Sequence, residues 1–323
     1  MIGRRLGLAV AMAMASAIAF AQPANVYVLP PAAGGPVPPP TPSGPPPDLA
    51  FGAFQRGHYI TAFDEAMKAI RADPKDSAAM TLIGELYRNG MGVRPDGAEA
   101  ERWYRLAAEL GDRQAQFELA VMTLTGQGGL QKDPEAAARL FEEAAAQGHA
   151  GALYNLGVIA IQGDDKTAPD FAKGAELFKR AAELGDGDAA YSYGLLLRSG
   201  RGVDLDTEEG ARWIKKSADA GVVAGEIEYA IMLYNGEGVL RDEAAAAKLF
   251  GKAAAQNNPI AQNRLAHLYA TGRGVKQDLA KAAAWNALAK AGGVKDDQLD
   301  ALAISLTPEQ RAQMLDIVRR QIF

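Results

Sequence analysis

The chain has 323 residues, of which 48% are hydrophobic, a formal net charge of -5 and no cysteine. This mild acidity, without any Lys/Arg run, argues against nucleic acid and anionic membrane as partners, because both favour a basic face. A chain without cysteine forms no disulfide, even in an oxidising compartment.

Residues 1–21 have the composition of a secretory signal peptide. Arg4 and Arg5 precede fifteen apolar or small residues, Leu6 to Phe20, and Ala19-Phe20-Ala21 forms an A-x-A cleavage site. The alternative is an uncleaved membrane anchor, but a bilayer span needs about 20 apolar residues. We therefore expect cleavage before Gln22, a periplasmic or secreted protein, and no membrane contact after cleavage.

Residues 22–48 form a proline-rich segment. Positions 23–47 hold 11 of the 17 prolines, interspersed with glycine. Proline removes backbone donors and favours an extended polyproline helix, and the segment has little apolar surface to bury. We expect a disordered linker here, with docking of a proline-reading partner as the alternative.

Residues 49–77 follow as a predicted helical hairpin. Phe54, Tyr59, Phe63 and Ala66 are spaced as in the tetratricopeptide type and lead to Asp73-Pro74. Such a hairpin would cap the first face of a repeat array.

Six repeated units are predicted over residues 78–293. WYRLAAELGD at 103–112 recurs as LFEEAAAQGH, LFKRAAELGD, WIKKSADAGV, LFGKAAAQNN and AWNALAKAGG. The closing residues are spaced by 37, 37, 36, 36 and 35 positions, and they are Gly111, Gly148, Gly185, Gly221, Asn257 and Gly292. A fixed period of this length indicates a stacked repeat array.

Each unit is predicted to contain two helices joined by glycine turns. The first helix carries a small residue at Gly84, Ala120, Gly157, Gly194, Ala230 and Ala266, and the second carries a small pair such as Ala107/Ala108. We expect these small positions to face each other inside the hairpin. Bulky residues fill the adjacent layer, at Tyr104, Phe141, Phe178, Ile214, Phe250 and Trp285.

A glycine is expected to end each first helix in the left-handed conformation, and in four units it opens a G-x-G-V turn. The valine can pack under the turn. A phosphate-binding loop is disfavoured because no strand precedes these glycines and no G-K-[ST] follows them. The third turn, Gly163 to Pro169, is longer, either as a contact site or through drift.

Residues 294–323 are predicted to form C-terminal capping helices. One covers Gln298 to Ile304, and another begins at Thr307-Pro308-Glu309-Gln310. Thr307 is expected to be the N-cap and Gln310 its capping-box partner. Terminal caps of this kind keep a solenoid soluble.

The units resemble the Sel1-like repeat, a relative of the tetratricopeptide repeat. The matching motifs are A-Q-F-E-L-A (115–120), A-L-Y-N-L-G (152–157), N-G-E-G-V (235–239) and W-Y-R-L-A-A-E-L-G-D. The resemblance implies an all-α fold, a right-handed α-solenoid of helical hairpins. It also implies an adaptor for proteins or peptides, with the first helix of each hairpin lining the concave side. A cysteine-rich branch is associated with β-lactam binding, but this chain lacks its cysteines.

Three columns of residues on the first helices are the candidate partner-binding face. An apolar stripe contains Val121, Val158, Leu195 and Ile231, and a polar column beside it contains Glu118, Asn155, Ser192 and Glu228. One turn further lie Asn89, Thr125, Gln162, Ser199, Asn235 and Thr271. Positions i, i+3 and i+7 share a helix face. The stripe is either a groove for a peptide or helix or is buried between neighbouring hairpins.

The sequence contains no recognisable catalytic, cofactor or metal motif. His58, His149 and His267 lie far apart, and His149 occupies a helix-start position held elsewhere by Asp112 and Asp186. No H-E-x-x-H or nucleophile elbow is present. The leading hypothesis is a non-enzymatic protein-binding scaffold of the cell envelope. The alternatives are a structural tether positioned by the proline-rich spacer, or an envelope hydrolase or β-lactam-binding protein.

Overall fold

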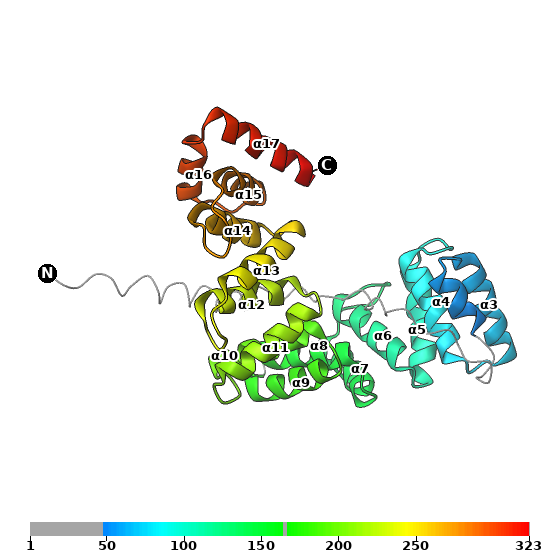
Figure 1. Ribbon diagram of the computed structural model, residues 1–323. Coiled ribbons are helices and arrows are strands. Elements are labelled where there is room, and N and C mark those ends of the chain that lie inside the picture. The colour runs from blue at the N-terminus through cyan, green and yellow to red at the C-terminus, as the bar shows by residue number, and fades with distance from the viewer. Residues whose placement is uncertain (1–47, 164–166, 323) are drawn as a thin grey trace, which may run out of the picture. The chain divides into compact units, whose positions relative to one another are not determined.

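The computed structural model describes residues 48–163 and 167–322, and this part of the chain is helical, with no strand among the described residues (Figure 1). The predicted signal peptide and nearly all of the predicted linker therefore lie outside the described residues. The chain divides into two compact units, residues 1–137 and 138–323. None of the described helices combines the length and apolar character that a bilayer crossing requires.

Along the chain, the helices follow one another as successive pairs, each made of a first and a second helix. The first unit contains α2 (Leu49–Gln55), α3 (Tyr59–Ala72), α4 (Ser77–Asn89), α5 (Gly97–Glu109) and α6 (Arg113–Thr125), and α7 (Pro134–Ala146) spans the boundary. The second unit continues with α8 (Ala150–Gln162), α9 (Phe171–Glu183), α10 (Gly187–Ser199), α11 (Thr207–Asp219), α12 (Val223–Asn235) and α13 (Glu243–Ala255). It ends with α14 (Pro259–Thr271), α15 (Leu279–Ala291), α16 (Asp297–Ile304) and α17 (Pro308–Ile322).

Side-chain caps set where most helices begin. Aspartate is the N-cap of α5, α9, α11, α13 and α15, and each carboxylate accepts a backbone N–H of the first turn. His149 caps α8 in the same way, since its Nδ1 accepts the N–H of Ala152 at 3.1 Å. The predicted capping box of α17 is confirmed: the N–H of Thr307 donates to Gln310 Oε1, and the N–H of Gln310 donates to Thr307 Oγ1.

Left-handed residues end the helices, as predicted. Gly90, Gly126, Gly200, Gly236 and Gly272 have φ between 62° and 74° and ψ between 23° and 35°. Gly163, in the atypical third turn, differs because its ψ is -169°. Asn257, with φ of 61°, is the one non-glycine residue at positive φ in the described chain.

The predicted end of the sixth unit is wrong by one residue. Gly292 has φ of -83° and caps α15, whereas Gly293 has φ of 92°. Gly293 is therefore the counterpart of Asn257, 36 positions earlier in the sequence. The repeated glycine pair in Ala291-Gly292-Gly293 made the two positions indistinguishable in the sequence, because either glycine accepts the left-handed conformation.

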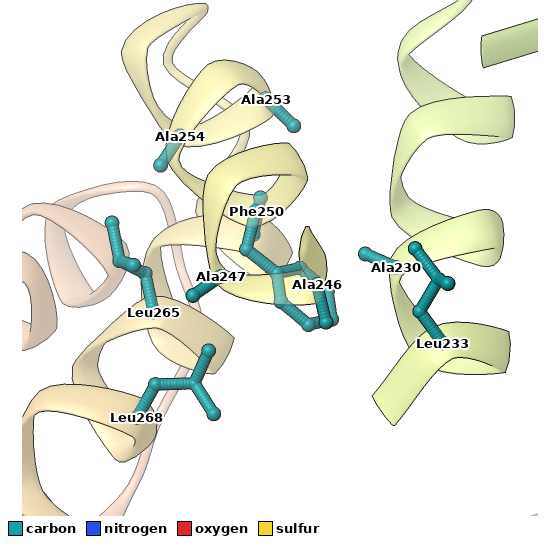
Figure 2. Close-up of a cluster of buried hydrophobic side chains, with 10 residues drawn as sticks. Ala230, Leu233, Ala246, Ala247, Phe250, Ala253, Ala254, Leu265 and Leu268 are labelled. Atoms are coloured by element: carbon teal, nitrogen blue, oxygen red, sulfur yellow. The ribbon is translucent and has the colours of Figure 1, made fainter. Parts of the chain in front are cut away.

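The core continues from one hairpin to the next. Figure 2 shows Phe250 of α13 among small side chains, with Leu265 and Leu268 of α14 on one side and Ala230 and Leu233 of α12 on the other. Phe250 is 3% exposed. Within each unit, second helices such as α5, α9, α11 and α13 contact both their own first helix and the next one, so the hairpins of a unit stack as in a solenoid.

The predicted seam of small residues facing small residues is wrong. A Cβ built on Gly84 would lie 2.7 Å from Tyr104, and one on Gly157 would lie 2.7 Å from Phe178. The small residue of the first helix therefore makes room for the bulky residue of the second. The small pair instead faces the following hairpin, where a Cβ on Gly225 would lie 2.8 Å from Cβ of Ser217.

Candidate protein-binding surface

The G-x-G-V turns hold successive hairpins together. Their second glycines lie against the start of the preceding hairpin's second helix. A Cβ on Gly202 would lie 2.2 Å from the carbonyl carbon of Phe171, and one on Gly274 would lie 2.0 Å from the carbonyl oxygen of Glu243. Val93, Val239 and Val275 pack against the core clusters, as predicted for the valine of the motif. These turns therefore allow the backbones of two neighbouring hairpins to approach closely.

The two glutamates of the polar column are engaged in ion pairs between hairpins. Arg88 of α4 pairs with Glu118 of α6, and Arg198 of α10 pairs with Glu228 of α12. Arg198 also donates to Glu237 Oε1 at 2.6 Å, in the next G-x-G-V turn. Burial raises the pKa of Glu118 while Arg88 acts to lower it. Glu118 and Glu228 therefore join neighbouring first helices, and their side chains are only 12% and 14% exposed.

The other two members of the polar column bond to their own helices. Asn155 is 6% exposed, and its side-chain amide donates to the carbonyl of Gly151 at 2.8 Å. Ser192 is half-buried and donates to the carbonyl of Asp188 at 2.9 Å. Neither side chain lies fully open to a partner.

The apolar stripe is mostly used in packing. Val121 has no exposed surface, and Val158, Leu195 and Ile231 are half-buried. Leu195 packs against the cluster of Ala211, Ile214 and Met232, and Ile231 packs against the cluster that contains Phe250. The arrangement favours burial between hairpins over an open apolar groove, and partner binding by the stripe and by the polar column stays a prediction.

The third column is the one that faces solvent. In the second unit it comprises four residues, which we call the polar ladder: Gln162, Ser199, Asn235 and Thr271, all of them exposed. The Ser199 hydroxyl donates to the carbonyl of Leu195, and the Thr271 hydroxyl donates to that of His267. The amides of Gln162 and Asn235 make no side-chain hydrogen bond with the described residues. In the first unit, Asn89 is exposed and Thr125 is half-buried.

In the sequence pattern, the ladder residues form only a polar border of the apolar stripe. The ladder residue is the last of each first helix, directly before its C-terminal glycine. It lies four positions after Val158, Leu195, Ile231 or His267, and so on the same helix face. The sequence feature that identifies the ladder is that every residue in this column is uncharged and polar.

The three histidines lie apart from one another, and each has a structural role at a helix start. His58 and His149 are the N-caps of α3 and α8. His267 Nε2 lies 2.6 Å from Asp296 Oδ2, and Asn263 donates to the same oxygen at 2.9 Å. Asp296 is the N-cap of α16, so this contact anchors the C-terminal helices. Among the described residues, no three His, Cys, Asp or Glu side chains are grouped so that they could hold a metal ion.

A family model described as "Sel1 repeat" matches six consecutive segments: 77–112, 113–149, 150–186, 187–222, 223–258 and 259–294. These segments together differ by one residue at each end from the predicted 78–293. No curated protein matches the sequence.

Two solved structures share the fold. A Sel1 repeat protein from Oxalobacter formigenes is 27% identical with a TM-score of 0.66, and the match covers 78% of this chain and 100% of that one. A protective antigen of uropathogenic Escherichia coli, described as displaying an SLR fold, is 25% identical with a TM-score of 0.52. That match covers 85% of this chain and 67% of the other.

Proposed function

Because this chain belongs to the Sel1 repeat family, we propose that it is a non-enzymatic scaffold that binds a protein or peptide along the first helices of its hairpins. Sel1 repeat proteins are in general protein-interaction scaffolds and are typically not catalysts. The observation that carries the proposal is the polar ladder, in which four successive hairpins each present one uncharged, exposed side chain at the same position.

The binding face should be centred on the polar ladder and not on the apolar stripe. The stripe and the glutamates beside it take part in packing and ion pairs between hairpins, whereas the ladder is exposed. Amide and hydroxyl groups can donate to and accept from a peptide backbone without the cost of desolvating a charge. The half-buried Val158, Leu195 and Ile231 would add apolar contact at its base.

Site-directed photo-cross-linking tests this face without disturbing the core. A photoreactive amino acid is placed at Ser199 or Asn235, and at Lys179 or Lys248 as controls, since these lysines are exposed on second helices. We expect the ladder positions to form an adduct with one protein species in cells and the lysine positions not to. If the ladder and the lysine positions form adducts equally, or if no position forms one above background, the ladder is not the binding face.

We also propose that the scaffold acts in the cell envelope after export. This rests on the sequence of residues 1–21, with Arg4, Arg5 and the A-x-A site at Ala19 to Ala21. N-terminal sequencing of the soluble protein should find Gln22 first. Soluble protein that begins at Met1 would rule out cleavage.

A further inference from the structure

The sixth repeat differs from the other five in its charge. Residues 259–294 contain five lysines and arginines but only one acidic residue, whereas each of the other five repeats has a net charge of -1 or -2. The basic residues of the sixth repeat are Arg264, Arg273, Lys276, Lys281 and Lys290. A basic repeat within a chain of net charge -5 indicates a local preference for a negatively charged partner.

Ion pairs within the chain compensate only part of this charge. Lys281 and Lys290 each have an acidic partner. Arg264, in contrast, is exposed on α14 and forms no ion pair or side-chain hydrogen bond with the described residues. Lys276 in the turn after α14 is also exposed and forms no such contact with the described chain. Two cations of the sixth repeat are therefore available to an anion from outside.

The contact between α10 and α12 shows how charge is balanced one hairpin earlier. Arg198 of α10 forms ion pairs with Glu228 of α12 and with Glu237 in the following turn. These glutamates lie 30 and 39 positions after the arginine. In the first unit, Arg88 and Glu118 form the same pair, also 30 positions apart. An arginine on one first helix is thus neutralised by carboxylates of the next hairpin.

In the sixth repeat, the charges at these positions are reversed. Tyr234 takes the place of Arg198, and the residues 30 and 39 positions later are Arg264 and Arg273. The second of these contacts is present, because Arg273 donates to the Tyr234 hydroxyl and its guanidinium carbon lies 4.1 Å from the centre of that ring. Tyr234 also packs against the core cluster that contains Leu265, the neighbour of Arg264. The register of the repeat therefore places Arg264 next to the same phenol, with no carboxylate between the two arginines.

The Tyr234 hydroxyl completes a site for a carboxylate. Because its oxygen accepts a bond from Arg273, its own proton remains available to donate. Arg273 shares the carboxylate of Glu243 with Arg241, so one acidic group serves two guanidinium groups. A carboxylate from outside would accept bonds from the hydroxyl and from Arg264, and such charge-assisted bonds are the strong ones.

The site adjoins the polar ladder. Asn235 directly follows Tyr234, and Thr271 lies seven positions after Arg264, on the same face of α14. Both ladder residues are exposed, so they can bond to the backbone of an extended peptide while its acidic side chain reaches the site. Nucleic acid fits this surface poorly, because its affinity depends on many phosphate contacts.

We propose that the first-helix face of the sixth repeat binds a glutamate or aspartate side chain of an extended peptide segment in the partner, with Arg264 and the Tyr234 hydroxyl as its ligands. Lys276 adds attraction for further acidic residues of the same segment. This inference rests on the proposed function and adds to it the chemistry of the partner.

Peptide display on the full chain tests the proposal. Short random peptides, fused to a coat protein through their C-termini, are selected on the parent chain and on Arg264→Glu. A fused peptide has no free C-terminus, so every enriched carboxylate belongs to a side chain. We expect the parent to enrich glutamate or aspartate, and the variant to enrich lysine or arginine. Lys248→Glu, the same charge change at an exposed residue of α13, is the control and should enrich the same peptides as the parent.

A double-mutant cycle then locates the contact. With a fluorescent peptide from the parent selection, Arg264→Gln should weaken binding about tenfold, and so should glutamine in place of the peptide's acidic residue. The two changes together should weaken binding little more than either one alone, because they remove the same bond. Tyr234→Phe keeps the ring beside Arg273 and should weaken binding about fivefold through the loss of one donor. Circular dichroism checks that each variant remains folded.

Peptides that bind the parent without an acidic residue would overturn this proposal and leave the proposed function standing. If no peptide is enriched above the bare support, both fail. Additive losses in the cycle, or enrichment of the same peptides by Arg264→Glu, would also overturn the proposal, because the acidic residue would then contact another part of the chain. If single-stranded DNA displaces the peptide as well as unlabelled peptide does, the site is a general anion site and the proposed acidic peptide is wrong.

Discussion

Two sets of glycines share a left-handed backbone but differ in their surroundings. Gly221 has φ of 83°, and a Cβ there would meet nothing within 4 Å. Gly274 has φ of 69°, and a Cβ there would collide with the backbone of Glu243. Gly221 lies directly after the end of α11, whereas Gly274 lies in the turn after α14 and permits one hairpin to rest on another.

Alanine substitution should separate these two roles. Gly221→Ala should cost about 1–2 kcal/mol, the usual penalty for a left-handed L-residue. Gly274→Ala should cost that and about 1–3 kcal/mol more, because the neighbouring backbone must shift. Urea unfolding midpoints of the two variants measure the difference. Equal costs would mean that the backbone at Glu243 accommodates the added Cβ without a penalty.

Glu85 is a residue whose charge opposes folding. It is half-buried on α4, and burial, together with Glu118, raises its pKa, while Arg88 acts to lower it. A carboxyl group whose folded pKa is raised destabilises the protein once it is ionised in both states.

Glu85→Gln should therefore stabilise the protein at pH 7, by about 0.5 kcal/mol as for other like-charge pairs. The gain should vanish as the pH falls below the ordinary glutamate value of 4.5, where the parent is protonated in both states. Thermal melts at several pH values provide the measurement, with the exposed Glu109→Gln as control. A gain that is independent of pH would refute the electrostatic explanation.

At the scale of the helix, capping explains why twelve helices, α4 to α15, each have 13 residues. Aspartate, asparagine or histidine side chains begin most of them, and glycine or asparagine follows the end. Val222 is an exception, because it is the N-cap of α12 and makes no side-chain cap bond.

Val222→Thr should therefore stabilise α12, since threonine keeps the shape of valine and adds a capping oxygen. We expect a gain of about 0.5–1 kcal/mol in the free energy of unfolding. Val223→Thr, one residue later, places the same hydroxyl inside the helix against the core and should be destabilising. If both variants behave alike, the hydroxyl is not acting as a cap.

At the scale of the whole molecule, the ends of the array need a cap, because each hairpin buries an apolar face of its neighbour and a terminal hairpin has a neighbour on one side only. The C-terminal cap is held partly by polar contacts: Asp296 accepts bonds from Asn263, His267 and the N–H of Leu299. Burial acts to raise the pKa of Asp296, but these bonds outweigh it, and the net pKa is lowered.

Asp296→Asn should loosen α16 at neutral pH by about 1 kcal/mol, through the loss of charge-assisted bonds. Because the folded pKa is lowered, this stabilisation is present above the ordinary value of 3.8 and is lost as the pH falls through the folded pKa. Hydrogen exchange of α16 and α17 should thus differ between parent and variant at pH 7 and converge in acid. A difference that persists there would contradict the prediction.

The helix ends and turns could be predicted from the sequence, because the residues that cause them lie within about four positions of each other. The period, the left-handed stops and the Thr307–Gln310 box depend on caps and turns, and they are confirmed in the structure. The resemblance to the Sel1 repeat followed from the same local motifs and is confirmed by the family match.

Contacts between helices could be decided only by the tertiary structure. Whether Gly84 faces Tyr104 or Ala107, and whether Leu195 faces solvent or Met232, depends on how two helices rotate against each other. Helical periodicity places residues on a common face but does not say which neighbour covers that face. For that reason the sequence determined the repeated hairpin, and the packing of hairpins decided that the ladder, and not the apolar stripe, is exposed.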